Sequence, residues 1–275
     1  MNNVDLRLWL PQVCALAEKA GASILEIYRS HDYDTTRKTD GSPVTTADTA
    51  ADAIIIAGLQ ALTPDIPVVT EETLAEIPFE RRRDWRTYWL VDPLDGTREF
   101  LARTDEFSVN IGLVVDGKPV LGVVYGPCLD TLYFGGPLLG AWRQQGAHVT
   151  PIRARKTLLA PARVAMSRRH GKRADAFAEA LPVPTETVHM GSALKTCLVA
   201  SGEADYYPRF GPTSYWDTAA GHAVLRAAGG DIVDMHGQPL RYVQSEDLLN
   251  PFFIARGPVI PAEALAVAAQ LAAQG

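Results

Sequence analysis

One seven-residue turn, Val91-Asp92-Pro93-Leu94-Asp95-Gly96-Thr97, constrains this chain more than any other segment. It places two carboxylates three residues apart, directly after the apolar run 88–91, which predicts a buried strand that ends at Asp92. Proline and glycine disfavour continuation of that strand into a helix, so Asp92 and Asp95 can point the same way. Oxygen ligands without His or Cys nearby suit Mg²⁺, Mn²⁺ or Ca²⁺ rather than zinc. The alternative is an Asx-type turn that only satisfies its own backbone.

Further acidic residues lie at the ends of other predicted elements. The strand-like run 66–70 ends in Glu71-Glu72, where the second glutamate should face away from the first and has a supporting role at most. Asp217 lies where a small-residue helix should start, and Asp48 follows Thr45 at the spacing of a capping box. Helix capping is therefore the alternative role for both aspartates.

Composition narrows the class of protein. With 275 residues, of which 47% are apolar, the chain can build one large domain or two small ones. A net charge of −6 argues against a nucleic-acid polymer as partner, although a bound metal would still allow a small anionic substrate. Cys14, Cys128 and Cys197 are far apart, which predicts neither a disulfide framework nor a zinc site.

The sequence also bears on location. No apolar run reaches the roughly 18 residues that span a bilayer. The first residues lack a basic region followed by an apolar core, which a secretory signal would need. We therefore expect no transmembrane segment and a cytoplasmic location.

The order of predicted elements divides the chain near residue 150. Residues 1–150 predict helices on an antiparallel-rich sheet, because apolar residues recur at helical spacing over 6–28 and Asp116-Gly117 is a hairpin signal. The polar residues 31–43 predict a loop. Residues 151–275 alternate short apolar runs with helical segments, which predicts an α/β half. The other predicted helices cover 46–62, 172–181, 192–201, 216–228 and 262–273, and the other strands cover 107–115, 119–125, 131–134, 141–143 and 164–166.

Three acidic motifs occur together and in order: Glu71-Glu72, the turn 92–97, and Trp216-Asp217 followed by Ala219-Ala220-Gly221. In this combination the chain resembles the inositol monophosphatase superfamily of metal-dependent, lithium-sensitive phosphatases, over nearly its whole length. The resemblance implies a layered α-β-α-β-α sandwich of the sugar-phosphatase type, an α+β or α/β fold, with the site between its halves. Within the superfamily, the chain is most similar to the bacterial 3′(2′),5′-bisphosphate nucleotidases. Four segments carry that likeness: 97–100, 167–170, 191–195 and 207–212.

The resemblance implies a set of metal ligands and catalytic residues. Two or three Mg²⁺ ions would be held by Glu71, Asp92, Asp95, Asp217 and the backbone carbonyl of Leu94. Asp48 and Thr97 would orient and help deprotonate the attacking water, and Glu71 completes the catalytic set. The N–H groups of Gly96 and Thr97, at the start of a short helix, would receive phosphate oxygens.

The same resemblance implies residues that bind the nucleotide. These are His170, Ser192, Lys195 and Arg209, and Asp217 also faces the substrate. Arginine suits this role because its planar fork binds two phosphate oxygens at once. From the residues alone, a surface histidine and a solvated helical lysine are the alternatives for His170 and Lys195.

The resemblance therefore implies Mg²⁺-dependent hydrolysis of the 3′-phosphate of adenosine 3′,5′-bisphosphate, a by-product of sulfate assimilation, to AMP and phosphate. One alternative is an inositol or sugar monophosphatase of the same fold, and another is a nucleotide-binding regulator without turnover. The chain departs from the family pattern at three positions. Arg98 stands where Lys is common, Thr70 where Ser is common, and Ala193 where a second Ser is common. The resemblance leaves the oligomeric state open and allows peripheral association with the cytoplasmic side of the inner membrane.

Overall fold

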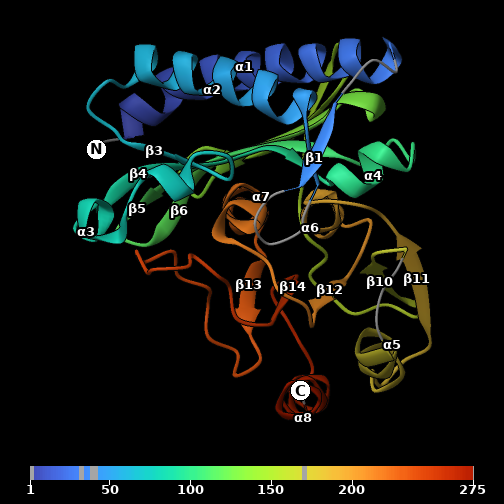
Figure 1. Cartoon of the computed structure of the whole chain (residues 1–275). Helices are drawn as coiled ribbons and strands as arrows, with labels where there is room; N and C mark the ends of the chain where they lie inside the picture. The colour runs from blue at the N-terminus through green and yellow to red at the C-terminus, as the bar shows by residue number, and fades with distance from the viewer. Residues whose placement is uncertain (1–2, 31–33, 38–42, 169–171, 275) are drawn as a thin grey trace.

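The structure of the chain, a computed structural model, describes residues 3–30, 34–37, 43–168 and 172–274. Its elements stack in five layers, in which pairs of helices alternate with a seven-stranded and a five-stranded sheet (Figure 1). This arrangement is the predicted α-β-α-β-α sandwich, so the predicted fold class is confirmed. No helix in the described part of the chain is both long enough and apolar enough to cross a membrane.

The first layer consists of α1 (Asn3–Ser30) and α2 (Thr46–Leu62), which lie side by side on one face of the larger sheet (Figure 1). The predicted helical periodicity has a direct counterpart in α1, whose residues Leu6, Leu10 and Val13 are buried against that sheet. Thr45 and Asp48 begin α2 with the predicted capping box.

The seven-stranded sheet follows the order of the sequence. β3 and β4 are parallel, and each later neighbouring pair is antiparallel. The predicted hairpin turn at Asp116-Gly117 joins β5 to β6. The strands are β3 (Val68–Thr70), β4 (Thr87–Asp95), β5 (Ser108–Val115), β6 (Lys118–Gly126), β7 (Thr131–Gly136), β8 (Gly140–Gln145) and β9 (His148–Pro151). Short helical elements lie between them: η1 (Leu74–Glu76), α3 (Phe79–Arg82), α4 (Thr97–Leu101) and η2 (Pro127–Leu129).

The middle layer consists of α6 (Leu194–Ala200) and α7 (Tyr215–Ala227), which lie between the two sheets (Figure 1). Gly112 on β5 and Gly122 on β6 are paired with each other beneath α7. A Cβ atom on Gly122 would lie 2.0 Å from the carbonyl oxygen of Ala220 on α7. The two glycines therefore let α7 approach the sheet more closely than any other residue would allow.

The five-stranded sheet has the strand order β11-β10-β12-β14-β13. β10 is parallel to β11 and β12, whereas β14 is antiparallel to β12 and β13. Its outer face is covered by α5 (Lys172–Glu179) and α8 (Ala262–Ala273), as Figure 1 shows. The strands are β10 (Ala162–Met166), β11 (Thr185–His189), β12 (Tyr206–Arg209), β13 (Asp231–Asp234) and β14 (Phe253–Arg256).

A long irregular connection between β13 and β14 returns to the first sheet, and we call its residues 241–250 the strap. Arg82 on α3 is 2% exposed and holds this segment. Its guanidinium donates to the side-chain oxygen of Gln244 and to the backbone carbonyls of Ser245 and Glu246. The strap therefore attaches the second half of the chain to α3 in the first half.

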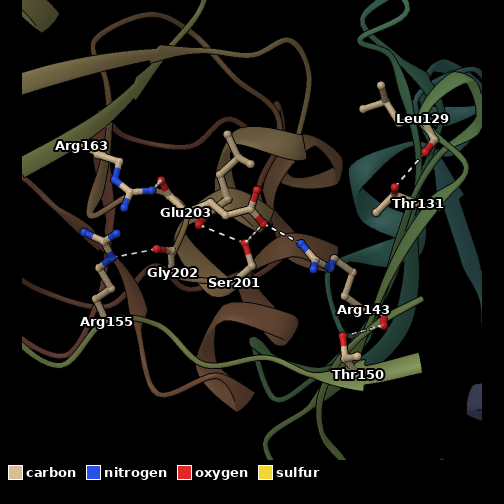
Figure 2. Close-up of polar contacts among 10 residues, drawn as sticks. Leu129, Thr131, Arg143, Thr150, Arg155, Arg163, Ser201, Gly202 and Glu203 are labelled. Atoms are coloured by element: carbon tan, nitrogen blue, oxygen red, sulfur yellow. Dashed lines mark hydrogen bonds and ion pairs between the residues drawn. The ribbon is translucent and has the colours of Figure 1, made fainter. Parts of the chain in front are cut away.

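A second link between the sheets runs through the turn that follows α6 (Figure 2). The Glu203 carboxylate accepts hydrogen bonds from Arg143 on β8 and from Ser201, both at 2.8 Å. Arg163 on β10 donates to the Glu203 carbonyl at 3.2 Å, and Arg155 donates to the Gly202 carbonyl at 2.8 Å. The end of α6 is therefore fixed to both sheets.

The prediction of a loop over 31–43 is wrong at residues 35–37 and 43, which are in strands. There β1 (Thr35–Arg37) and β2 (Pro43–Thr45) form an antiparallel pair. The pairing lies outside both main sheets, so its residues need no apolar alternation that would reveal a strand. Residues 31–33 and 38–42 of the predicted loop lie outside the described part of the chain.

Candidate active site

Two parallel strands bring separate acidic motifs together. Thr70 at the end of β3 pairs with Val91 on β4, and the Glu71 N–H donates to the Val91 carbonyl at 3.1 Å. Because parallel neighbours end at the same edge of a sheet, Glu71 lies next to Asp92, which is 1% exposed. The predicted proximity of these two motifs is present in the structure.

The turn after Asp92 is a bulge within β4 and not the end of the strand. Asp92 pairs with Asn110, and the ladder with β5 resumes where Asp95 pairs with Ser108, so Pro93 and Leu94 together face one residue of β5. The prediction that the strand ends at Asp92 is therefore wrong, because the pairing that continues it involves a distant segment. Asp92 Oδ1 also accepts the Leu94 N–H at 3.1 Å, so the Asx turn considered as an alternative exists within this motif.

Asp95 connects the turn to the middle layer of the fold. Its Oδ2 atom accepts the backbone N–H of Ala193 at 2.6 Å and the side-chain amide of Asn110 at 3.3 Å. The next residue, Gly96, has a φ of 94°, a left-handed conformation that glycine adopts without strain. This conformation turns the chain directly into α4, which begins at Thr97.

Asp48 and Thr97 are in contact, as the resemblance implies. The Thr97 hydroxyl lies 3.1 Å from Asp48 Oδ1, to which it can donate. Asp48 Oδ2 accepts the Thr45 N–H at 2.8 Å and the Thr45 hydroxyl at 2.7 Å. One carboxylate oxygen thus caps α2 while the other faces Thr97, so capping and a role at the site are compatible.

Asp217 has a similar arrangement at the start of α7. Its Oδ2 atom accepts the Ser214 N–H at 2.9 Å, as part of a second capping box. The close approach of α7 to Gly112 and Gly122 sets how far this first turn lies from β4. The capping alternative is therefore present as geometry, and it fixes the carboxylate that faces the turn.

The carboxylates are close enough to raise one another's pKa. Burial and the charges of Glu71, Asp95, Asp217 and Asp48 raise the pKa of Asp92 well above its ordinary value. Burial and the neighbouring Asp95 raise the pKa of Asp217 to about 8. Burial raises the pKa of Asp95 to about 6, although the Lys195 ammonium opposes the rise. The site concentrates more negative charge than it can hold ionised at neutral pH.

This charge pattern fits a divalent cation. Among the described residues, no group of three or more His, Cys, Asp or Glu side chains is already arranged to hold a metal ion. The fit rests on the chemistry of the donors, because a cation among buried carboxylates removes the repulsion that raises their pKa values. Oxygen donors favour Mg²⁺, Mn²⁺ or Ca²⁺. The ligand set itself stays a prediction.

A cavity of about 400 Å³ opens beside these carboxylates, and we call it the substrate cavity. It lies between α4, the starts of α6 and α7, and the ends of β10 and β12. Asp95 and Asp217 line it, as do the cationic side chains of Arg98, Arg168, Lys195 and Arg209. One cavity therefore joins the acidic cluster to basic groups on α4, on α6 and at the ends of β10 and β12.

Three of the predicted nucleotide-binding residues line the substrate cavity. Ser192 has a φ of 48°, and its carbonyl accepts Lys195 Nζ at 2.6 Å. Burial lowers the pKa of Lys195 to about 8, although Asp95 opposes the fall, and its Nζ lies 5.2 Å from the centre of the Tyr207 ring. Arg209 donates to the Pro212 carbonyl at 3.1 Å. The fourth predicted residue, His170, lies outside the described residues.

Comparison with known proteins agrees with this geometry. The sequence model of the inositol monophosphatase family matches residues 5–273. The chain belongs to the inositol monophosphatase family.

Relatives within the family add detail. The 3′(2′),5′-bisphosphate nucleotidases CysQ of Salmonella typhimurium and Escherichia coli K12 are each 48% identical to this chain. Each match covers 89% of this chain and 98% of the relative. The crystal structure of CysQ from Bacteroides thetaiotaomicron, 38% identical, has a TM-score of 0.77 and covers 89% of this chain and 95% of its own. An inositol monophosphatase from Thermotoga maritima, 23% identical, shares the fold with a TM-score of 0.78, covering 95% of this chain and 97% of its own.

Sequence reasoning gave no role to three residues that shape the site: Asn110, Glu106 and Arg168. Asn110 contacts Asp95 from the neighbouring strand. Glu106 forms a two-pronged ion pair with Arg168, which lines the substrate cavity, and Arg168 Nε lies 3.1 Å from Glu106 Oε2. The Glu106 backbone also lies so close to Gly191 that a Cβ there would be 2.4 Å from its carbonyl oxygen. Only Arg168 carried a signal, because it lies in a segment that resembles the nucleotidases.

Proposed function

We propose that this chain hydrolyses the 3′-phosphate of adenosine 3′,5′-bisphosphate to give AMP and phosphate. The observation that carries the proposal is the substrate cavity, which is lined both by the acidic residues Asp95 and Asp217 and by the basic residues Lys195 and Arg209. A site for a substrate with two phosphates can bind one of them through metal ions at an acidic end and the other through cationic side chains at a basic end. The 48% identity to CysQ nucleotidases supports the same reaction.

The acidic end would hold two or three Mg²⁺ ions through Glu71, Asp92, Asp95, Asp217 and the carbonyl of Leu94. Bound Mg²⁺ supplies charge neutralisation at the phosphate oxygens and lowers the pKa of water at the site. Asp92 supports this assignment, because burial and like charges penalise its ionised form unless a cation compensates.

Asp48 and Thr97 would act on the attacking water. The Thr97 hydroxyl, which can donate to Asp48 Oδ1 at 3.1 Å, positions the water through its lone pairs and passes a proton toward the carboxylate. Burial raises the pKa of Asp48, which makes this carboxylate a better proton acceptor, although hydrogen bonds from Thr45 and Thr97 oppose the rise. Backbone N–H groups of Gly96 and Thr97 would receive phosphate oxygens.

The basic end would bind the 5′-phosphate and the ribose. Lys195 is 4% exposed and already hydrogen-bonded to the Ser192 carbonyl, so its charge is held in place before substrate arrives. Arg209 has a buried Nε atom without a hydrogen-bond partner among the described residues, and a phosphate oxygen would satisfy it. Ser192 offers a hydroxyl at the same wall.

Phosphate release across a substrate panel tests the proposal. With Mg²⁺ present, adenosine 3′,5′-bisphosphate should be hydrolysed much faster than AMP, inositol 1-phosphate or fructose 1,6-bisphosphate. A preference for inositol 1-phosphate would instead identify a monophosphatase of the same fold. Tight nucleotide binding without any phosphate release would identify a regulator.

A further inference from the structure

A second cavity of about 520 Å³ adjoins the substrate cavity, and we call it the outer cavity. The two share Ser167, Tyr207 and Arg209 in their walls, so Arg209 stands at their junction. The outer cavity lies where β10 and β12, two parallel neighbours, reach their C-terminal ends. Crevices at such strand ends are the usual ligand sites of open α/β sheets.

The lining of the outer cavity is basic. Lys172, Arg173 and Arg209 contribute three cations, and its described lining residues include neither Asp nor Glu. No described carboxylate forms an ion pair with Lys172 or Arg173. This lining therefore suits an anionic group and differs from the substrate cavity, which contains Asp95 and Asp217.

Aromatic rings hold one of these cations in place. The Arg173 guanidinium lies 5.9 Å from the centre of the Phe252 ring, and Phe252 packs edge-on against Phe210 with ring centres 6.2 Å apart. Phe210 itself lines the outer cavity, next to Pro208. The wall thus offers a fixed positive charge beside an apolar face.

The positions of the charges orient a substrate along the two cavities. If the reacting 3′-phosphate lies at Asp95 and Asp217, the 5′-phosphate points toward Arg209, and whatever is attached to that phosphate continues into the outer cavity. Adenosine 3′,5′-bisphosphate carries nothing beyond its 5′-phosphate. The outer cavity has no use in the hydrolysis of that compound.

We propose that the outer cavity admits a larger class of substrate: 3′-phosphonucleotides whose 5′-phosphate is linked through a second phosphate to a further group. This inference rests on the proposed function and extends it. The reaction is the same hydrolysis: water forms the new bond to phosphorus, the bond from phosphorus to the 3′-oxygen breaks, and that oxygen takes a proton. The products are inorganic phosphate and the 5′-diphosphate ester with a free 3′-hydroxyl.

Coenzyme A serves as the probe, because it carries a 3′-phosphate and a 5′-diphosphate ester of an extended chain. The wild-type chain with Mg²⁺ should release phosphate from coenzyme A as well as from adenosine 3′,5′-bisphosphate. Arg173→Ala should lower kcat/KM on coenzyme A by at least about tenfold, the effect of losing a charge-assisted contact. The same change should alter kcat/KM on the bisphosphate by less than about twofold, because Arg173 does not line the substrate cavity.

Two controls make the result decisive. Lys118→Ala removes an exposed lysine on β6 and should leave both activities unchanged. Dephospho-coenzyme A lacks the reacting phosphate, so its competitive inhibition of bisphosphate hydrolysis reports binding alone and should weaken by a similar factor in Arg173→Ala.

The outcomes separate this inference from the proposed function. Hydrolysis of the bisphosphate without hydrolysis of coenzyme A would overturn the inference and leave the proposed function standing. An equal loss on both substrates in Arg173→Ala, or no loss on either, would also overturn it. If neither compound were hydrolysed, the proposed function itself would fail, and the inference with it.

Discussion

Replacing Gly122 by alanine should displace α7 and, with it, Asp217. The added Cβ would lie 2.0 Å from the carbonyl oxygen of Ala220, whereas ordinary contact begins at 3.4 Å. The neighbouring atom is helix backbone and cannot rotate away, so α7 must move outward by about 1.4 Å, the difference between those two distances. Overpacking of this kind costs about 1–3 kcal/mol of unfolding free energy.

The displacement should also reduce turnover. A misplacement of about 1 Å in a catalytic group can cost about a hundredfold in rate. We expect Gly122→Ala to need more Mg²⁺ for half-maximal activity, because Asp217 would no longer meet the turn at Asp95. Circular dichroism should show a melting temperature lower by about 2–4 °C for each kcal/mol lost.

Gly126→Ala is the matched control on the same strand. Its Cβ would lie 3.3 Å from the end of the Leu194 side chain, which can rotate, so stability and activity should change little. The reasoning would be refuted if Gly122→Ala melted and turned over like the wild type. A fall in stability with unchanged Mg²⁺ dependence would show that Asp217 does not depend on the position of α7.

Three further results are expected. Chelator should abolish activity, and added Mg²⁺ should restore it. Asp95→Asn should lower the rate by at least about a hundredfold, since changes outside the ligand shell alone cost about 10–100-fold. A near-normal rate would show that Asp95 only stabilises the turn. Thr97→Val should preserve nucleotide binding, measured by calorimetry, but lower kcat, because the lost hydroxyl acts chiefly in the transition state; an unchanged kcat would contradict this role. Burial lowers the pKa of His222, which is 1% exposed and bonded to Asp231, so the unfolded chain binds its proton more readily and stability should fall as pH drops below about 6.5. Thermal melts of His222→Gln between pH 7.5 and 5 should show a shallower slope, whereas the exposed His236→Gln should keep the wild-type slope.

Local signals predicted the elements that depend on local chemistry. The hairpin at Asp116-Gly117 and the capping box at Thr45 were predictable because a few adjacent residues determine each one. The long helix α1 was predictable because a single buried stripe repeats along it. Such features need no knowledge of what they pack against.

Two edge strands, β9 and β11, were not predictable. β11 is an edge strand whose residues are mostly exposed, and β9 is exposed at every position. Neither buries one face completely, so neither shows the alternation that reveals a strand. The continuation of β4 through Asp95 was missed for a related reason, because it depends on pairing with Ser108 in another strand.

The candidate site shows the same division. Acidic residues after strands and before helices were visible in the sequence, together with their family pattern. The contact of Asn110 with Asp95 and the ion pair between Glu106 and Arg168 were not visible, because each joins segments that are separate in the chain. The roles of the individual site residues, and the division of the chain at residue 150, stay predictions.

The strap changes how the substrate cavity can open. Besides Arg82, it is joined to the first half through the Tyr88 hydroxyl, which donates to the Tyr242 carbonyl, and through Arg241, which donates to the Asp116 carbonyl at 2.7 Å. A hinge motion that swung the two sheets apart would break these bonds together, each at a net cost of about 0.5–1.5 kcal/mol. The fold therefore resists a clamshell movement of the two sheets. We expect ligand entry to depend instead on shifts of short segments beside the substrate cavity, such as the one that carries Arg168 and its contact with Glu106.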